Sequence, residues 1–326
     1  MRVLKFGGTS VANAQNIKLV LDIVIKKAEQ EKLIVVVSAF TKVTDLLVLA
    51  SQKAASNDES YKEIVAEIEK KHLDAIKELI PVSEQSGLLS HIKRIINHLE
   101  TLLDGCFLLG ELSPRTSDTI LSFGELLSSY IIAEAFKQKD KNSGYKDSRE
   151  LIKTNNNFGK AGVNFEVTNA LITDYFASNN SQIVVMPGFI ASTEEGIGTT
   201  LGRGGSDYTA AILAGALNAS ELEIWTDVNG MFTANPKIVK QAQPIATISY
   251  QEAMELSHFG AKVLYPPTIQ PVFKKNIPIW IKNTFEPEAE GTFISNQDNS
   301  HTNPVKGISH IDNITLITLE GSGMIG

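Results

Sequence analysis

The fold is constrained most by a series of short apolar runs, rich in β-branched residues, that stop at glycine or hydroxyl residues. Runs of this kind are typical of strands that are covered on both faces. Helical stretches separate them along the chain, which favours a mostly parallel sheet between two layers of helices. The sequence therefore predicts an α/β fold, a three-layer α/β/α sandwich, with strands at residues 3–6, 33–37, 183–191, 222–230 (including an Asn-Gly turn) and 277–283.

Between these runs, apolar residues recur at helical spacing. The region from 45 to 139 is rich in Ala, Glu, Lys and Leu and contains few prolines. The segment 61–80 is highly charged, which is typical of a solvated surface helix. Short strands are expected near 151–152 and 163–165. Further helices are expected over residues 88–109, 118–136, 168–178, 209–217 and, after a capping box at 249–252, up to residue 258.

Charge and residue usage exclude several classes of protein. The 326 residues carry a net charge of -7 at pH 7, which argues against nucleic acid as the main partner. A single cysteine, Cys106, excludes a disulfide framework, and the six histidines lack metal-ligand spacing. The sequence shows no signal-peptide pattern and no apolar run of membrane-spanning length. These features predict a soluble, cytoplasmic protein without a metal site of its own.

The first strand ends in a motif that suits an anion. Residues 3–10 read Val-Leu-Lys-Phe-Gly-Gly-Thr-Ser, an apolar run that stops at two glycines before a helix. Gly7 and Gly8 lack a Cβ, so a ligand can approach their backbone closely. Free N–H groups near a helix start attract phosphate, and Lys5 would add a positive charge there. An ordinary strand–helix turn with a solvated lysine explains the local pattern equally well.

A glycine-rich cluster at residues 198–208 surrounds one arginine. Arg203 has no structural role in such a loop, and arginine binds a carboxylate or phosphate in a bidentate manner. Ser206 and Asp207 open the next helix, where Ser206 is placed as the N-cap and Asp207 lies near the positive helix end. Arg203 is therefore a candidate binding residue, whereas helix capping alone explains the Ser-Asp pair.

Glu125 is a charged residue within the apolar helical stretch 120–127. A carboxylate that faces a core needs a partner. Either a salt bridge within the protein or the ammonium group of a ligand would supply one.

Four polar segments follow the carboxyl ends of predicted strands, at residues 5–8, 38–39, 186–188 and 226–227. Ligands of parallel α/β sheets bind beyond these ends, so we expect the four segments to share one rim. Cations and N–H groups suit phosphate and carboxylates suit an ammonium, which favours phosphoryl transfer. The sequence has no Walker A motif, no glycine loop followed by His-Arg-Asp, and no Rossmann glycine motif after the first strand.

Four motifs carry a family resemblance. They are Lys-Phe-Gly-Gly-Thr-Ser at 5–10, Gly-Arg-Gly-Gly-Ser-Asp at 202–207, Trp-Thr-Asp at 225–227 and Phe-Gly-Ala-Lys-Val-Leu at 259–264. In this order they resemble the aspartate kinases of the amino acid kinase superfamily. The resemblance implies a catalytic domain over residues 1–294, a linker at 295–304 and, over 305–326, the truncated start of an ACT regulatory domain like that of bifunctional aspartokinase–homoserine dehydrogenases.

The resemblance also implies a reaction, in which ATP phosphorylates the β-carboxylate of L-aspartate to give 4-phospho-L-aspartate and ADP. This is the first step toward lysine, threonine and methionine. An aspartate side chain is already ionised at neutral pH, so no general base is needed. Mg²⁺ would be held mainly by the nucleotide phosphates. The implied partners are L-aspartate, ATP and further copies of the chain, with dimerisation partly through the ACT region and with no nucleic acid or membrane.

Individual residues take roles by the same resemblance. Lys5 and Lys262 are the phosphate-side cations and, with Asp207, the implied catalytic residues. Arg203 would bind the substrate α-carboxylate, and Glu125 and Asp207 its α-ammonium. The other substrate-side residues are Ser38, Thr44 and Ser206. The implied nucleotide-binding residues are Lys5, Gly7, Gly8, Ser10, Thr226, Asp227, Phe232, Lys237, Lys262 and Val263.

The sequence departs from the family pattern on the nucleotide side. Asn229, Phe232 and Lys237 stand where many relatives have Asp, Tyr and Arg, and Tyr265 stands where His is common. Phe232 lacks a hydroxyl, and Lys237 cannot reproduce the fork of an arginine. Two alternatives are another acyl-phosphate-forming amino acid kinase, such as one that acts on glutamate, and a regulatory subunit with weakened catalysis.

Overall fold

The computed structural model describes residues 1–140, 142–258, 264–296, 305–310 and 315. Its centre is an eight-stranded sheet in which only the β9–β10 pair is antiparallel. The expected α/β fold with a mostly parallel sheet is therefore confirmed. From one edge to the other the strands are β3 (Ser143–Tyr145), β4 (Ile183–Pro187), β2 (Leu33–Val37), β1 (Arg2–Phe6), β7 (Leu222–Thr226), β9 (Ile279–Asn283), β10 (Thr292–Ser295) and β8 (Thr247–Ser249).

Burial on both faces explains why the central strands are unbroken apolar runs. All five residues of β2 are buried. Leu4 and Val35 pair across β1 and β2 and belong to the core on one face of the sheet. Val3 and Ile34 also pair and belong to the core on the other face. No polar residue interrupts β2, and the first polar residue after it is Ser38.

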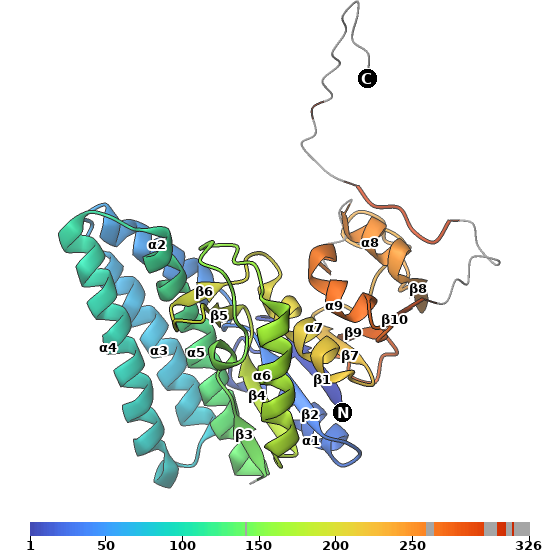
Figure 1. The fold of residues 1–326 in the computed structure, drawn as a ribbon, viewed down its shortest axis with the longest axis horizontal. Helices are drawn as coiled ribbons and strands as arrows, with labels where there is room; N and C mark the ends of the chain where they lie inside the picture. Colours follow the sequence, from blue (N-terminus) through green and yellow to red (C-terminus); the bar gives the residue numbers. More distant parts are fainter. Residues whose placement is uncertain (141, 259–263, 297–304, 311–314, 316–326) are drawn as a thin grey trace, which may run out of the picture.

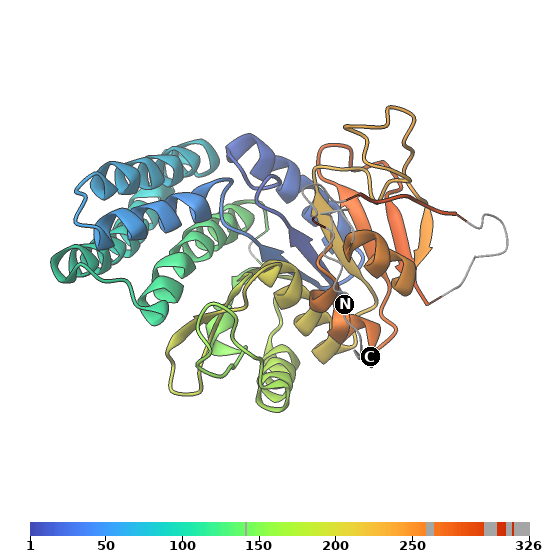
Figure 2. The same cartoon turned by 90° about the horizontal axis from the view of Figure 1, so that it is seen from above.

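Five helices and one face of the sheet form a continuous apolar core, with α2 to α5 as a bundle at the side of the molecule (Figures 1 and 2). The helices are α1 (Ala14–Ala28), α2 (Val43–Ala55), α3 (Tyr61–Leu79), α4 (Gln85–Leu109) and α5 (Pro114–Lys139), with the short η1 (Val82–Glu84) between α3 and α4. The expectation that residues 61–80 form a solvated helix is wrong, because Tyr61, Ile68 and Ile76 of α3 are buried in this core.

The opposite face is covered by the second half of the chain (Figure 1). A separate hairpin, β5 (Ile190–Ser192) and β6 (Gly198–Thr200), precedes the helix that begins at Gly205. The remaining elements are η2 (Ser148–Glu150), α6 (Phe165–Ser178), α7 (Gly205–Leu217), α8 (Tyr250–His258), η3 (Pro266–Ile269) and α9 (Gln270–Phe273).

Several local predictions need correction. The strands expected near 151–152 and 163–165 are isolated bridges, Lys153 with Ser192 and Thr154 with Val163. Residues 183–191 form β4 and the start of β5, separated at Gly188 and Phe189, and 277–283 is followed by one more strand, β10. The capping box is confirmed, because the Ser249 N–H donates to Glu252 Oε2 (2.8 Å) and the Glu252 N–H to Ser249 Oγ (3.2 Å).

Helix α5 is long and apolar enough to cross a membrane by length and composition, although the sequence analysis expected no such stretch. Of its most apolar window, 72% is buried inside the protein. The burial of α5 is that of a core helix in the α/β fold.

The expected linker and ACT start lie mostly outside the described residues. Of residues 305–326, residues 305–310 and 315 are described, and residues 305–310 contact the preceding part of the chain. The Ile308 N–H donates to the Thr233 carbonyl (2.8 Å), and Lys306 pairs with Glu252 of α8 (2.9 Å).

Candidate active site

The carboxyl ends of β1, β2, β4 and β7 meet at one rim of the sheet, as expected. These strands are consecutive parallel neighbours in the order β4-β2-β1-β7. The glycine turn follows β1, Ser38 follows β2, Gly188 follows β4 and Asp227 follows β7.

A cavity of about 410 Å³ opens at this rim, and we call it the rim cavity. Most of the predicted substrate-side residues line it. Its lining residues are Lys5, Gly8, Ser38, Ala39, Phe40, Thr41, Lys42, Thr44, Asp45, Glu125, Phe189, Gly202, Gly204, Gly205, Ser206 and Asp207.

Lys5 and Asp207 form an ion pair inside the rim cavity. The Lys5 Nζ lies 2.7 Å from Asp207 Oδ1, and the two side chains are only 12% and 14% exposed. Lys5 comes from the end of β1 and Asp207 from the first turn of α7. The pair places one cation and one anion at the base of the cavity, where a phosphate and an ammonium could each find a partner.

The start of α7 is held close to the turn after β4. Gly204, not Ser206, is the N-cap, with a φ of 70°. A Cβ on Gly205 would lie 2.6 Å from the Phe189 ring, and one on Gly188 would lie 2.6 Å from the Ser206 Cβ. Only glycine allows this approach, and it brings the positive helix end into the rim cavity.

Glu125 supplies a buried carboxylate from α5. One oxygen, Oε1, accepts the Ala39 N–H at 3.3 Å, whereas Oε2 is buried without a hydrogen-bond partner in the described part of the chain. Burial raises the pKa of the Glu125 carboxyl to about 8, against the opposing effects of the Ala39 N–H and the Lys5 charge. The salt bridge considered from the sequence is not formed within the described residues, so a cationic ligand group would satisfy Oε2.

The glycine turn after β1 is fixed by its own hydrogen bonds. The Gly7 N–H donates to the Trp225 carbonyl (3.1 Å), and the buried Ser10 hydroxyl contacts the same carbonyl (3.3 Å) and Thr284 Oγ1 (2.7 Å). Gly8 borders the rim cavity. Two of the groups predicted to bind phosphate therefore hold the loop in this conformation.

Arg203 lies outside the lining of the rim cavity. Its side chain is exposed, and its Cζ lies 5.5 Å from the centre of the Tyr265 ring. Its neighbours Gly202 and Gly204 do line the cavity. The arginine is thus adjacent in the chain to the cavity lining, and its guanidinium lies over an aromatic ring.

The predicted nucleotide-side residues follow β7, the strand next to β1. Thr226 ends β7, and its hydroxyl donates to Asp227 Oδ1 (3.2 Å). Phe232 forms an isolated bridge with Pro244, and Lys237 is exposed. None of these four lines the rim cavity, whereas Lys5 and Gly8, which are also predicted to bind the nucleotide, do line it. Lys262 and Val263 lie outside the described residues.

Several residues of the site were not found from the sequence. Lys42 and Phe189 line the rim cavity with φ angles of 68° and 66°, a strained region for side-chain-bearing residues. Asp118, on α5, holds the loop before Arg203. The only signal for Asp118 was its position seven residues before Glu125, which places both on one face of a helix.

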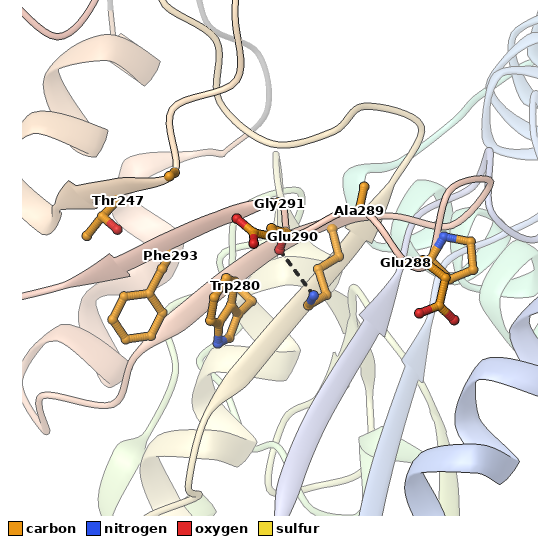
Figure 3. A pocket seen from close by; sticks show the side chains of 10 residues that line it. Thr247, Trp280, Glu288, Ala289, Glu290, Gly291 and Phe293 are labelled. Carbon is orange, nitrogen blue, oxygen red and sulfur yellow. Dashed lines mark hydrogen bonds between the residues drawn. The ribbon is translucent and has the colours of Figure 1, made fainter.

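Another cavity, of about 570 Å³, lies on the outer part of the sheet (Figure 3). Trp280 and Phe293 pack with ring centres 4.8 Å apart, and Lys282 Nζ donates to the Glu290 carbonyl (3.1 Å). None of the described residues predicted for the site lines it. The chemistry therefore concentrates in the smaller rim cavity.

Comparison with known proteins gives consistent matches. The model described as the amino acid kinase family matches residues 1–283. Bifunctional aspartokinase/homoserine dehydrogenase 2, chloroplastic, from Arabidopsis thaliana is 39% identical over 330 residues, which are 99% of this chain and 36% of the relative. The chain thus spans about a third of the length of this plant protein.

Two further matches cover more of the relative. Lysine-sensitive aspartokinase 3 of Escherichia coli is 35% identical over 99% of this chain and 70% of its own length. The crystal structure of E. coli aspartokinase III in complex with aspartate and ADP superimposes with a TM-score of 0.84, at 35% identity, over 92% of this chain and 65% of that chain.

Proposed function

The chain belongs to the amino acid kinase family, and from this premise we propose that it is an aspartate kinase. It transfers the γ-phosphoryl group of ATP to the β-carboxylate of L-aspartate. Relatives named aspartokinases support the proposal, among them the E. coli enzyme with aspartate and ADP bound.

One observation carries the proposal, namely the unpartnered Oε2 of Glu125 in a cavity that also holds the Lys5–Asp207 pair. A buried carboxylate oxygen without a donor favours a ligand with an ammonium group. An α-amino acid has such a group, and its side-chain carboxylate could then lie toward Lys5. A phosphate binder alone would not need the buried acid.

In the proposed reaction, a β-carboxylate oxygen of aspartate forms a bond to the γ-phosphorus. The bond from that phosphorus to the β,γ-bridging oxygen breaks, and ADP leaves with the electron pair. Lys5 stabilises the charge on the transferring group, and Glu125 and Asp207 hold the substrate ammonium. Arg203 binds the α-carboxylate after it turns from Tyr265, and Ser38, Thr44 and Ser206 supply substrate-side hydroxyls.

ATP would lie beside the rim cavity, against the ends of β1 and β7. We assign Gly7, Gly8, Ser10, Thr226, Asp227, Phe232, Lys237, Lys262 and Val263 to its binding. The described residues contain no group of three or more His, Cys, Asp or Glu side chains that could hold a metal ion. Magnesium would therefore be bound through the nucleotide phosphates and water, where it neutralises phosphate charge.

The wider context is also a proposal. We assign the reaction to the start of lysine, threonine and methionine biosynthesis, in a cytoplasmic homo-oligomer. The names of the plant relatives support a homoserine dehydrogenase part in the same protein. The assignment of residues 305–326 to the start of an ACT regulatory region rests on the sequence resemblance alone.

The test is ADP release and hydroxamate formation with ATP and L-aspartate, L-glutamate or no amino acid. We expect turnover with aspartate, little with glutamate and none without an acceptor. Preference for glutamate would establish the alternative amino acid kinase, and no turnover in a folded, nucleotide-binding sample would favour the regulatory subunit.

Lys5→Met provides the control that assigns activity to this site. The loss of one electrostatic stabiliser of a transition state typically costs about 100-fold or more in kcat. We expect a loss of that size with a folded protein. A near-normal kcat in Lys5→Met would mean that the activity has another origin.

A further inference from the structure

Asp118 is a buried carboxylate that makes no contact with the rim cavity. It is 1% exposed, and within the described part of the chain it accepts hydrogen bonds from uncharged groups of two segments. The Gly159 N–H lies 3.0 and 2.9 Å from its two oxygens. The Thr200 N–H and hydroxyl each lie 2.9 Å from one of them. Four close contacts on one carboxylate form a strong anchor, because hydrogen bonds to an ionised acceptor are the stronger kind.

The two anchored segments contact each other next to the loop that carries Arg203, residues 201–204. The Ala161 N–H donates to the Thr200 carbonyl (3.0 Å). A Cβ on Gly202 would lie 3.1 Å from the Gly159 carbonyl oxygen, so Gly202 packs on the same segment. Residues 201–204 therefore start from a base that Asp118 holds, and α7 with Asp207 follows at once.

Asp118 lies on the helix that also carries Glu125, seven positions before it along α5. Seven residues are close to two helical turns, so the two carboxylates share one face. We propose that Asp118 is a positioning residue. It fixes the distance between Glu125 on α5 and the segment that contains the Arg203 loop and the start of α7. This inference rests on the proposed function, since these are the proposed ammonium and carboxylate ends of the amino acid site.

The expected consequence is selective for the amino acid. If the anchor is removed, Arg203 and Asp207 lose their fixed distance from Glu125, whereas the turn after β1 keeps its bonds to Trp225. We expect Asp118→Ala to raise the KM for aspartate about tenfold or more, and the KM for ATP by less than about twofold. Asp118→Asn keeps one acceptor oxygen, so its KM for aspartate should lie between those of the wild type and Asp118→Ala.

Two milder variants keep the test valid if Asp118→Ala does not fold. Thr200→Val removes one donor at nearly constant volume, and Thr200→Ser restores it. Thr168→Val is the matched control, because Thr168 of α6 is equally buried and its hydroxyl bonds the backbone of Lys153, and neither residue lines the rim cavity. We expect a raised aspartate KM in Thr200→Val, recovery in Thr200→Ser and no change in Thr168→Val.

The second readout is amide hydrogen exchange of residues 201–205, which does not depend on activity. We expect faster exchange there in Asp118→Asn and Thr200→Val than in Thr168→Val. If the wild type turns over no amino acid, the proposed function fails and this exchange alone decides the role of Asp118. Unchanged exchange, or aspartate and ATP KM values that rise together, would overturn the inference.

Discussion

The role in substrate binding that we propose for Glu125 would come at the expense of stability. Burial raises the pKa of Glu125 from the ordinary value of 4.5 to about 8. At a pH between these values, Glu125 is protonated in the folded protein and ionised in the unfolded chain. The free energy of unfolding should therefore fall as the pH rises between these two values. A substrate ammonium would offset this cost by pairing with the ionised form.

We predict that Glu125→Gln removes this pH dependence. Relative to the variant, the wild type should lose up to about 1.4 kcal/mol of stability per pH unit between pH 5 and 8. Urea unfolding over this range measures the difference. Glu134→Gln is the control on the same helix, since Glu134 is only partly buried and pairs with Lys137. Parallel stability curves for Glu125→Gln and the wild type would contradict the assignment of a protonated, buried Glu125.

Arg203 carries the second prediction at this scale. Arg203→Ala should raise the KM for aspartate by about tenfold or more, because loss of a charged hydrogen-bond partner costs about 2–5 kcal/mol when the partner is buried, and tenfold needs only about 1.4 kcal/mol. Arg203→Lys should recover little, since an ammonium cannot make the bidentate contact. Steady-state kinetics at saturating ATP measure both variants. An unchanged aspartate KM in Arg203→Ala would remove Arg203 from the substrate site.

The sequence predicts some of these residues better than others. Lys5 and Glu125 stand out because each is a charge in an apolar element. Asp118 does not, because its partners Gly159 and Thr200 are 41 and 82 positions away and only the fold brings them together. The exposed position of Arg203 against Tyr265 likewise depends on packing between distant segments.

Helix α5 and the loop after β2 depend on one glycine. A Cβ on Gly124 would lie 2.9 Å from the Ala39 Cβ, and this close approach lets the Ala39 N–H reach Glu125. Neither atom is the end of a flexible chain, so an added methyl group must push the two elements apart.

We predict that Gly124→Ala destabilises the protein by about 1–3 kcal/mol, the usual cost of overpacking. Gly105→Ala on α4 is the matched control, because a Cβ there meets nothing within 4 Å. Alanine is favoured over glycine in a helix by about 0.5–1 kcal/mol, so this control should be slightly stabilising. Chemical denaturation compares the two. Equal effects would mean that the contact between α5 and the loop is loose.

Elements with a long, regular pattern were predictable, and short ones were not. The unbroken apolar run of β2 predicts a strand, and the apolar stripe of α4 predicts a helix. The three residues of β6, Gly198 to Thr200, read as a glycine loop because their strand form comes from pairing with β5. The burial of α3 was missed because its many charges hide one apolar face.

At the scale of the molecule, the net charge of -7 would be unfavourable for the two anionic substrates that we propose. The attraction must therefore be local, and the architecture supplies it. Parallel strands gather Lys5, the turn after β1 and the start of α7 at one rim. The alternation of strands and helices predicts the overall order of layers. It does not predict which side chains point into the rim cavity.

The central claim is that this rim transfers a phosphoryl group to the side-chain carboxylate of L-aspartate. Phosphorus NMR of the product tests it most directly, with aspartate that carries heavy oxygen in its β-carboxylate. The account predicts an acyl-phosphate signal that forms only with ATP, aspartate and the wild-type protein, and that shows the isotope shift of a heavy oxygen bonded to phosphorus. An aspartate-dependent phosphate product without that shift, or no such product from a folded protein that binds ATP, would contradict it.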